Sequence, residues 1–322
     1  MNYESNFTES EHEIVSPGAS IPVAPEGFKS GFVGIVGRPN VGKSTLMNQL
    51  VGQKIAITSP IAQTTRNRLQ GILTTPESQL IFIDTPGIHK PHHELGKVLV
   101  KNARSAIDSV DVVLFVVDSS VEVGGGDRFI VDLLKRTQTP VIVGLNKADQ
   151  QPPDSQPLDE SYAQLDLPNH WSLLKFSALT GAGLESLQQQ LTSQLEPGPY
   201  YYPPDLMTDQ PERFVMAELI REQILLLTRQ DIPHSIAIVI DWVTEQPKHT
   251  EILATVHVER NSQKRILIGK KGSMLKAIGT AARQQIQTLI AGKVYLQLFV
   301  KVQPKWRQSR MRLAEFGYQL EE

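Results

Sequence analysis

Cysteine is absent from this chain of 322 residues, and so is any long apolar run. Without cysteine there is no disulfide, thiolate-bound zinc, iron–sulfur cluster or thiol catalysis, and a reducing compartment is weakly favoured. The apolar run Val112–Val117 is bounded by Asp111 and Asp118, whereas a membrane-spanning helix needs about 20 apolar residues. We therefore expect a soluble, cytoplasmic protein that at most attaches to a membrane surface.

Acidic residues are absent from one long segment. The formal net charge is only −2, but Arg260–Arg312 carries 13 basic residues and no acidic one. Residues 1–200 hold 15 Lys and Arg against 21 Asp and Glu, so the two parts of the chain have opposite net charge. A basic segment of this kind fits a polyanion partner or an ordinary solvated face, and charge alone leaves both open.

Periodicity is absent from the first 28 residues, which contain acidic residues, proline and glycine but no hydrophobic signal core. We interpret residues 1–28 as a disordered acidic tail and not as a targeting peptide. At about 150 residues per domain, the length of the chain suggests two domains.

Short apolar runs alternate with longer, helix-compatible stretches from residue 29 to residue 196. The candidate strands are Phe32–Val36, Leu80–Ile83, Val112–Val117, Val141–Leu145 and Leu173–Phe176. The candidate helices are Lys43–Val51, Glu94–Ile107, Asp127–Lys135 and Leu184–Leu195. This alternation predicts an α/β domain with a mostly parallel sheet and helices on both faces.

The chain changes character after residue 196. The run Glu196–Asp205 is rich in proline and cannot continue a helix, so we place a linker at residues 197–212. Apolar spacing then predicts amphipathic helices in Phe214–Leu227 and Leu275–Leu289. Alternating patterns predict three strands, in Ile236–Trp242, Ile252–Val258 and Val294–Val302. Residues 213–312 should therefore form a small α+β domain in the order helix, strand, strand, helix, strand.

The first candidate strand leads into the phosphate-binding pattern Gly37-Arg-Pro-Asn-Val-Gly-Lys-Ser44, and a candidate helix follows it. Glycines let backbone N–H groups surround phosphates, and the helix N-terminus adds a positive dipole. Lys43 would reach the β and γ phosphates, and the Ser44 hydroxyl would bind Mg²⁺. The pattern and its setting predict a nucleoside triphosphate site.

Guanine is the base that the sequence favours. Asn146-Lys-Ala-Asp149 follows a candidate strand, and the Asp149 carboxylate can accept hydrogen bonds from guanine N1–H and its 2-amino group, a pair that adenine lacks. The Lys147 stem can lie along the ring. Ser177-Ala-Leu179 follows another candidate strand and would add backbone contacts to the base.

Two further segments are candidates for sensing the γ phosphate. Asp84-Thr-Pro-Gly87 ends a candidate strand, where Asp84 would hold Mg²⁺ through water and the Gly87 N–H would meet the γ phosphate. Thr65, or Thr64 as the alternative, would bind Mg²⁺ only when the γ phosphate is present.

The basic segment contains Ile268-Gly-Lys-Lys-Gly272, which we interpret as the nucleic-acid loop of a type II KH domain opening a helix. Two glycines let a nucleic-acid backbone approach, and the lysines add charge. Single-stranded RNA is the expected ligand, because KH loops clamp about four nucleotides. Ile266, Ile268, Leu275 and Ile278 would line the base groove or belong to the core, and the sequence leaves both open.

These motifs, with Gln63-Thr-Thr-Arg66 and Thr208-Asp-Gln-Pro-Glu-Arg-Phe214, resemble the Era family of bacterial GTPases over about residues 29–310. The resemblance implies a GTPase that binds small-subunit (16S) ribosomal RNA near its 3′ end and acts in 30S subunit assembly. It also implies further phosphate contacts from Lys305, Arg307, Arg310 and Arg312. We also expect a monomer, with a fraction of the protein bound peripherally to the inner membrane.

Hydrolysis in this family raises a particular question here. Ras-like enzymes place a water-orienting glutamine where this chain has Ile88, so another device must position the water. The resemblance implies that Asn40 helps to hold a K⁺ ion. We interpret His89, His92 and His93 as solvated side chains and not as a catalytic or metal site.

The candidate site residues are numerous. Those for GTP or GDP are Gly37, Arg38, Pro39, Asn40, Val41, Gly42, Lys43, Ser44, Thr45, Asp84, Thr85, Pro86, Gly87, Ile88, Asn146, Lys147, Ala148, Asp149, Ser177, Ala178 and Leu179. Those for catalysis are Asn40, Lys43, Thr65 and Gly87, and those for Mg²⁺ are Ser44, Thr65 and Asp84. Those for RNA are Ile268, Gly269, Lys270, Lys271, Gly272, Lys305, Arg307 and Arg310.

The leading interpretation is a GTP-hydrolysing switch that controls RNA binding. The alternative is an RNA-binding scaffold of ribosome maturation whose GTP turnover is incidental, which the missing glutamine allows. A phosphate-loop kinase or ATPase is disfavoured by Asp149.

Overall fold

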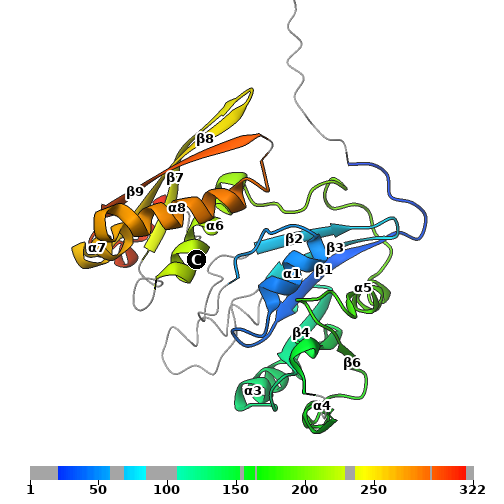
Figure 1. Cartoon of the computed structure of the whole chain (residues 1–322). Helices are drawn as coiled ribbons and strands as arrows, with labels where there is room; N and C mark the ends of the chain where they lie inside the picture. Colours follow the sequence, from blue (N-terminus) through cyan, green and yellow to red (C-terminus); the bar gives the residue numbers. More distant parts are fainter. Residues whose placement is uncertain are drawn as a thin grey trace, which may run out of the picture.

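The computed structural model describes residues 21–58, 69–84, 107–152, 156–163, 165–228, 236–290 and 292–316, without the side chains of residues 156, 157, 163 and 310. These residues form two sheets with their helices (Figure 1). Most of the predicted acidic tail, residues 1–20, and most of the predicted helix Glu94–Ile107 lie outside the described residues.

Six strands form the larger sheet, in the order β2-β3-β1-β4-β5-β6. Their bounds are β1 Lys29–Val36, β2 Leu69–Thr74, β3 Ser78–Asp84, β4 Val112–Asp118, β5 Val141–Asn146 and β6 Ser172–Lys175. Five strands run parallel, and only the edge strand β2 is antiparallel, to β3. The predicted mostly parallel sheet is confirmed, but β2 was not predicted.

Helices cover both faces of this sheet, as expected. Helices α1 (Lys43–Val51) and α5 (Leu184–Ser193) bury leucines and Met47 against one face. Helices α3 (Gly125–Leu134) and α4 (Gln156–Ala163) pack on the other face, where Ile130 and Tyr162 are fully buried. Helix α4 is short and weakly apolar, and the sequence did not predict it.

Three strands form the smaller sheet: β7 (Ile236–Gln246), β8 (His249–Val258) and β9 (Lys293–Val302). Strand β8 is antiparallel to β7 and parallel to β9. Helices α6 (Glu212–Leu227) and α8 (Ser273–Ile286) pack on one face through a shared apolar core. This arrangement confirms the predicted KH-type α+β fold.

Two local predictions for this part were wrong. An additional helix, α7 (Asn261–Ile268), precedes the glycine loop, so Ile268 ends one helix instead of opening the next. Trp242 was placed on the same strand face as Ile240, but a bulge between them turns Trp242 to the outer face, where it pairs with Leu253. Neither the short helix nor the extra strand residue has a clear periodic signal.

The C-terminal part returns to the outer face of the small sheet. Its short helix α9 (Arg310–Glu315) is followed by Phe316, whose ring lies 4.4 Å from the His257 ring of β8. Trp306 is buried beside Phe316. The segment after β9 therefore covers one end of this face.

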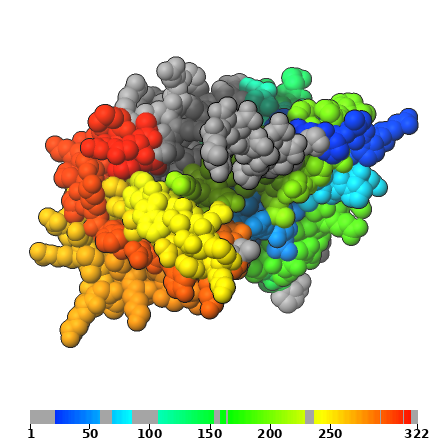
Figure 2. Space-filling model, turned by 90° about the horizontal axis from the view of Figure 1, so that it is seen from above, coloured from blue at the N-terminus to red at the C-terminus, as the bar shows by residue number. Residues whose placement is uncertain are grey.

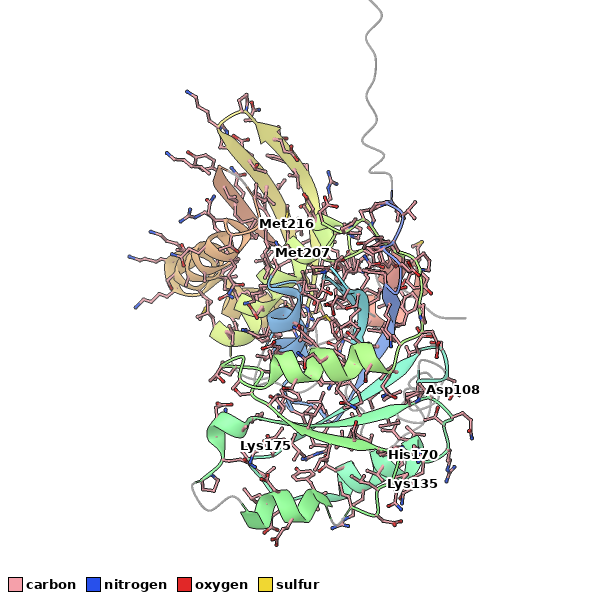
Figure 3. All side chains as sticks on the ribbon, turned by 90° about the vertical axis from the view of Figure 1, so that its right-hand side faces the viewer. Asp108, Lys135, His170, Lys175, Met207 and Met216 are labelled. Carbon is pink, nitrogen blue, oxygen red and sulfur yellow. The ribbon has the colours of Figure 1, made fainter. Side chains whose placement is uncertain are left out.

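The linker is fastened along the edge of the large sheet. The Met207 carbonyl oxygen accepts a hydrogen bond from the Ile72 N–H at 2.8 Å, and the Thr208 hydroxyl donates to the Gln70 carbonyl oxygen at 2.7 Å. Met207 then lines a hollow of about 300 Å³ together with Met216 of α6, and Figure 3 shows the two side chains close together. In the view of Figure 2, the part with the small sheet lies at one end of the molecule and the part with the large sheet at the other.

Among the helices in the described ranges, none combines the length and apolarity required to span a membrane.

Candidate functional sites

The phosphate-binding loop lies where β1 ends and α1 begins, as predicted. Asn40 and Gly42 both have left-handed backbones, with φ of 64° and 97°. A Cβ at residue 42 would lie 2.4 Å from Asn146 Nδ2, and one at residue 37 would lie 2.3 Å from the Val116 carbonyl oxygen. Glycine is therefore required at positions 37 and 42 by close packing, and at position 42 by backbone conformation as well.

Lys43 points back across this loop. Its Nζ donates to the carbonyl oxygens of Gly37 at 3.2 Å and Arg38 at 3.0 Å. Burial lowers the pKa of Lys43, and the nearby Asp84 carboxylate opposes that shift. A buried cation whose partners among the described residues are two carbonyl oxygens and a nearby carboxylate is suited to binding an anion such as a phosphate.

Ser44 and Asp84 bring hard oxygen donors together beside the loop. The Ser44 hydroxyl donates to Asp84 Oδ2 at 3.2 Å, and Asp84 is fully buried at the end of β3. A hydroxyl and a carboxylate close to a phosphate site form a donor set that fits Mg²⁺. The two residues predicted to hold the metal here are therefore adjacent.

Asn146 connects the phosphate-binding loop to the base side of the site. Its Nδ2 donates to the Val41 carbonyl oxygen at 2.8 Å, and its Oδ1 accepts from the Ala178 N–H at 2.8 Å. The side chain is only 2% exposed. Three loops that are far apart in the sequence are thereby held by one amide.

The carboxylate predicted to recognise guanine lies at the surface and is oriented from behind. The Ser177 hydroxyl donates to Asp149 Oδ1 at 2.6 Å, while Ser177 itself is buried. Ala148 and Leu179 come from the same two loops, and Leu179 is 67% exposed. An exposed carboxylate fixed by a buried hydroxyl can meet a ligand without searching through rotamers.

Sequence reasoning missed Asp118, at the end of β4. Its Oδ2 lies 2.5 Å from Lys147 Nζ, and Oδ1 accepts from Ser120. Partial burial raises the pKa of Asp118, but hydrogen bonds from Lys147 and Ser120 outweigh it and the pKa is lowered overall. Its position at the carboxyl end of a central parallel strand is a signal that could have identified it.

Sequence reasoning also missed Asp127, which holds Arg38 in the loop. Arg38 Nε donates to Asp127 Oδ1 at 2.7 Å, and the Asp127 side chain is fully buried. Asp127 Oδ2 accepts from the Gly124 N–H at the start of α3. The phosphate-binding loop is therefore anchored to α3 by one carboxylate.

Several predicted site residues lie outside the described residues. They are Thr64, Thr65, Thr85, Pro86, Gly87 and Ile88, together with His89, His92 and His93.

The second candidate site is the glycine loop between α7 and α8. Gly269, Lys271 and Gly272 all have positive φ, at 70°, 53° and 81°. A Cβ at residue 269 would lie 2.7 Å from the Met274 Cβ. Lys270 and Lys271 are exposed, so the loop presents two ammonium groups on a tightly turned backbone.

A groove of about 390 Å³ follows this loop, between α8 and the edge strand β9. It is lined by Gly272, Leu275, Lys276, Gly279, Thr280, Arg283, Leu296 and Leu298. Apolar residues on its floor and basic residues on α8 suit bases and phosphates of a single strand. Lys276 and Arg283 were missed, although the helical spacing from Gly272 places them on its face.

The structure places differently the four apolar residues that the sequence assigned to either the base groove or the core. Leu275 lines the groove and also packs against the core, and Ile278 is fully buried in the core. Ile268 is partly buried and packs against that core. Ile266 is 48% exposed and lines neither.

Two of the C-terminal basic residues, Arg307 and Arg312, have acidic partners. Arg307 Nη2 donates to Glu259 Oε2 at 2.6 Å, and Arg312 pairs with Glu315. Lys305 is exposed, with φ of 55°. The Arg310 side chain is outside the described part of the structure, so its predicted role in RNA binding remains a prediction.

Comparison with known proteins matches both parts of the chain. Residues 32–147 match the family model described as "50S ribosome-binding GTPase", and residues 231–307 match the KH domain model. GTPase Era of Rippkaea orientalis is 72% identical over 94% of this chain and 96% of the relative. GTPase Era of a Nostoc species is 73% identical over 96% of this chain and 95% of the relative.

Two solved structures have the same overall fold. Aquifex aeolicus Era bound to GDP and AlF4⁻ gives a TM-score of 0.83 at 39% identity and covers 91% of this chain and 100% of its own. Era in complex with MgGDPNP and nucleotides 1506–1542 of 16S ribosomal RNA gives a TM-score of 0.82 at the same identity and coverage. The chain belongs to the Era family of GTPases.

Proposed function

We propose that this GTPase binds the 3′ region of small-subunit ribosomal RNA through its KH groove, under the control of GTP, during assembly of the 30S subunit. The observation that carries the proposal is that one chain holds both a loop of the phosphate-binding pattern, with Asp149 and Lys147 on a neighbouring loop, and a groove with basic residues beside the glycine loop. The solved Era complex with 16S ribosomal RNA nucleotides supports the choice of RNA.

At the nucleotide site, Lys43 binds the β and γ phosphates and Asp149 selects guanine. The buried ammonium group and the oriented carboxylate support these roles. The backbone around Gly37 and Gly42 surrounds the phosphates. Thr65 and the Gly87 N–H respond to the γ phosphate, and Lys147 lies along the base.

Ser44, Asp84 and Thr65 would hold Mg²⁺, which neutralises charge on the β and γ phosphates when bound. The hydroxyl of Ser44 and the carboxylate of Asp84 support this assignment. Since Ile88 replaces a water-orienting glutamine, Asn40 would help to hold a K⁺ ion that supplies positive charge at the phosphates. Equal hydrolysis rates in sodium and potassium salts would contradict the role of Asn40.

In the KH domain, Gly269 and Gly272 admit the RNA backbone, and Lys270 and Lys271 contact phosphates. The bases then lie in the groove beside Leu275. Lys305, Arg307 and Arg310 add phosphate contacts. Arg307 would first have to leave Glu259, so we expect the smallest contribution from it.

A double variant tests the RNA site separately from the nucleotide site. Replacing Lys270 and Lys271 with glutamate should abolish binding of RNA nucleotides 1506–1542 and preserve GTP affinity. The matched control replaces Lys248 and Lys293 with glutamate, since these exposed residues lie at the opposite end of the small sheet. Unchanged RNA affinity in the first variant would overturn the assignment of the RNA site.

GTP control is tested by crosslinking to RNA in the GTP and GDP states, with sequencing of the captured RNA. We expect capture of the 16S 3′ region to differ between the two states. If Lys43→Ala abolishes nucleotide binding yet ribosome assembly proceeds normally, the protein is a scaffold with incidental turnover. A monomeric state, a cytoplasmic location and a peripheral membrane fraction remain predictions, which sedimentation and fractionation would check.

A further inference from the structure

A buried carboxylate of the KH domain lies against the GTPase domain. Glu222 belongs to α6 and is fully buried. Its Oε1 accepts from the Thr58 N–H at 2.7 Å and from the Thr58 hydroxyl at 3.1 Å. Its Oε2 lies 2.5 Å from Lys54 Nζ. Three of the hydrogen bonds to this carboxylate therefore come from one short segment of the other domain, residues 54–58.

The same segment is held from its other side by the helix that starts at the phosphate-binding loop. Asn48 of α1 accepts from the N–H groups of Ile55 at 3.0 Å and Ala56 at 2.8 Å. Its Nδ2 also donates to the Ala56 carbonyl oxygen at 2.7 Å. Residues 54–58 are thus clamped between α1, which begins at Lys43 and Ser44, and α6 of the KH domain.

The position of this segment in the sequence is informative. Thr58 directly precedes residues 59–68, which contain the threonines proposed to respond to the γ phosphate. On the other side, α6 packs against α8, the helix that lines the RNA groove. Figure 1 shows α6 on the side of the KH domain that faces the GTPase domain. Glu222 therefore lies between the two sites.

The burial of Glu222 favours a contact with residues 54–58 that is either complete or absent. A buried carboxylate is tolerated only when charged and hydrogen-bonding partners compensate its desolvation. If residues 54–58 moved away from α6, Glu222 would lose Lys54 and both Thr58 donors at once. Within α6 the remaining hydrogen bond is a long one, 3.2 Å, from Gln223. The contact should therefore be made or broken as a unit.

We propose that Glu222 is the positioning residue that couples the nucleotide site to the RNA groove, by holding residues 54–58 in the arrangement that one nucleotide state requires. The inference rests on the proposed function, because it names the contact through which GTP would control RNA affinity. Glu222 touches neither substrate nor RNA in this role.

The test measures RNA affinity with a GTP analogue and with GDP, and takes the ratio of the two. RNA nucleotides 1506–1542 serve as the labelled probe, and nucleotide affinity is measured in parallel. Glu222→Ala should bring the ratio at least about fivefold closer to one, since coupling in allosteric proteins is typically 5- to 150-fold. Because coupling is reciprocal, the effect of RNA on the preference for the GTP analogue over GDP should shrink by the same factor.

Additional variants separate coupling from a structural role. Glu222→Gln keeps an acceptor for the Thr58 N–H and should retain part of the ratio. Thr58→Val with Lys54→Met removes the Lys54 and Thr58 hydroxyl donors without altering α6, and it should also bring the ratio closer to one, by less than Glu222→Ala because the Thr58 N–H still donates. Glu218→Gln is the matched control, since Glu218 pairs with Arg221 inside the same helix. A general loss of stability would weaken RNA binding in both nucleotide states and leave the ratio unchanged.

The outcomes distinguish two failures. If the wild-type ratio is one, GTP control of RNA binding is wrong and Glu222 couples nothing. If the wild-type ratio differs from one but remains unchanged in Glu222→Ala and in the Thr58 and Lys54 double variant, the proposed function stands and the role of Glu222 is wrong. Should Glu222→Ala fail to fold, Glu222→Gln and the double variant decide.

Discussion

The ammonium group of Lys147 lies 2.5 Å from the carboxylate of Asp118, and the two residues come from the ends of neighbouring parallel strands. Both side chains are mostly buried, with 24% and 15% exposed. Lys147 itself has a left-handed backbone, with φ of 67°. The ion pair fixes the direction in which the lysine stem leaves this strained position, so the stem is oriented before a base arrives.

Asp118→Asn should weaken GDP binding by about tenfold, because a charge-assisted hydrogen bond that orients Lys147 is replaced by a neutral one. Fluorescence titration with a labelled nucleotide measures the effect. Asp166→Asn is the control, since that carboxylate pairs with Lys135 at an exposed site. Equal affinities for wild type and Asp118→Asn would show that Lys147 needs no such partner.

Asn146→Ala should destabilise the GTPase domain by about 2–4 kcal/mol, because the Val41 carbonyl and the Ala178 N–H lose a buried partner. Chemical denaturation measures the loss. Because the loops around the base are no longer held together, the affinity for GDP should fall. A higher GDP concentration than in the wild type should then be needed to restore part of the stability. A variant as stable as the wild type would mean that water replaces the amide.

Lys276→Ala and Arg283→Ala should each weaken RNA binding and leave GTP affinity unchanged. Each lost phosphate contact should lower the slope of log affinity against log salt by about 0.7, the value for a single strand. Titrations at several salt concentrations provide the slope. Arg307→Ala is the comparison, because Arg307 is already paired with Glu259 and should change the slope less. An unchanged slope in both groove variants would exclude phosphate contacts there.

His257→Phe should flatten the dependence of stability on pH. Burial lowers the pKa of His257, Lys301 and Arg312 act in the same direction, and Asp241 and Glu315 oppose them. The unfolded chain, with a histidine pKa of about 6.5, therefore binds more protons, so the wild type loses stability as pH falls through that value. Thermal unfolding between pH 5 and 7 provides the measurement. A parallel loss in the variant would mean that another group titrates.

The sequence by itself determined the elements that local chemistry specifies. The glycines at 37 and 42, the lysine after them and the alternation of apolar runs predict a strand, a phosphate-binding loop and a helix without knowledge of neighbours. The same holds for the glycine loop at Gly269–Gly272 within an acid-free basic segment. Family resemblance then predicted both domains together.

Only the tertiary structure decided which side chains meet across long sequence separations. Asp118 and Asp127 are ordinary carboxylates in the sequence and become partners of Lys147 and Arg38 through strand and helix packing. Trp242 lies on the opposite face from the one predicted, because a single bulge reverses the period-2 pattern of the strand. The sequence pattern gives no sign of that bulge. In the sequence, Glu222 lies outside the apolar face of its helix, where a charged residue is expected to be exposed. It is buried because the other domain covers it and supplies its partners.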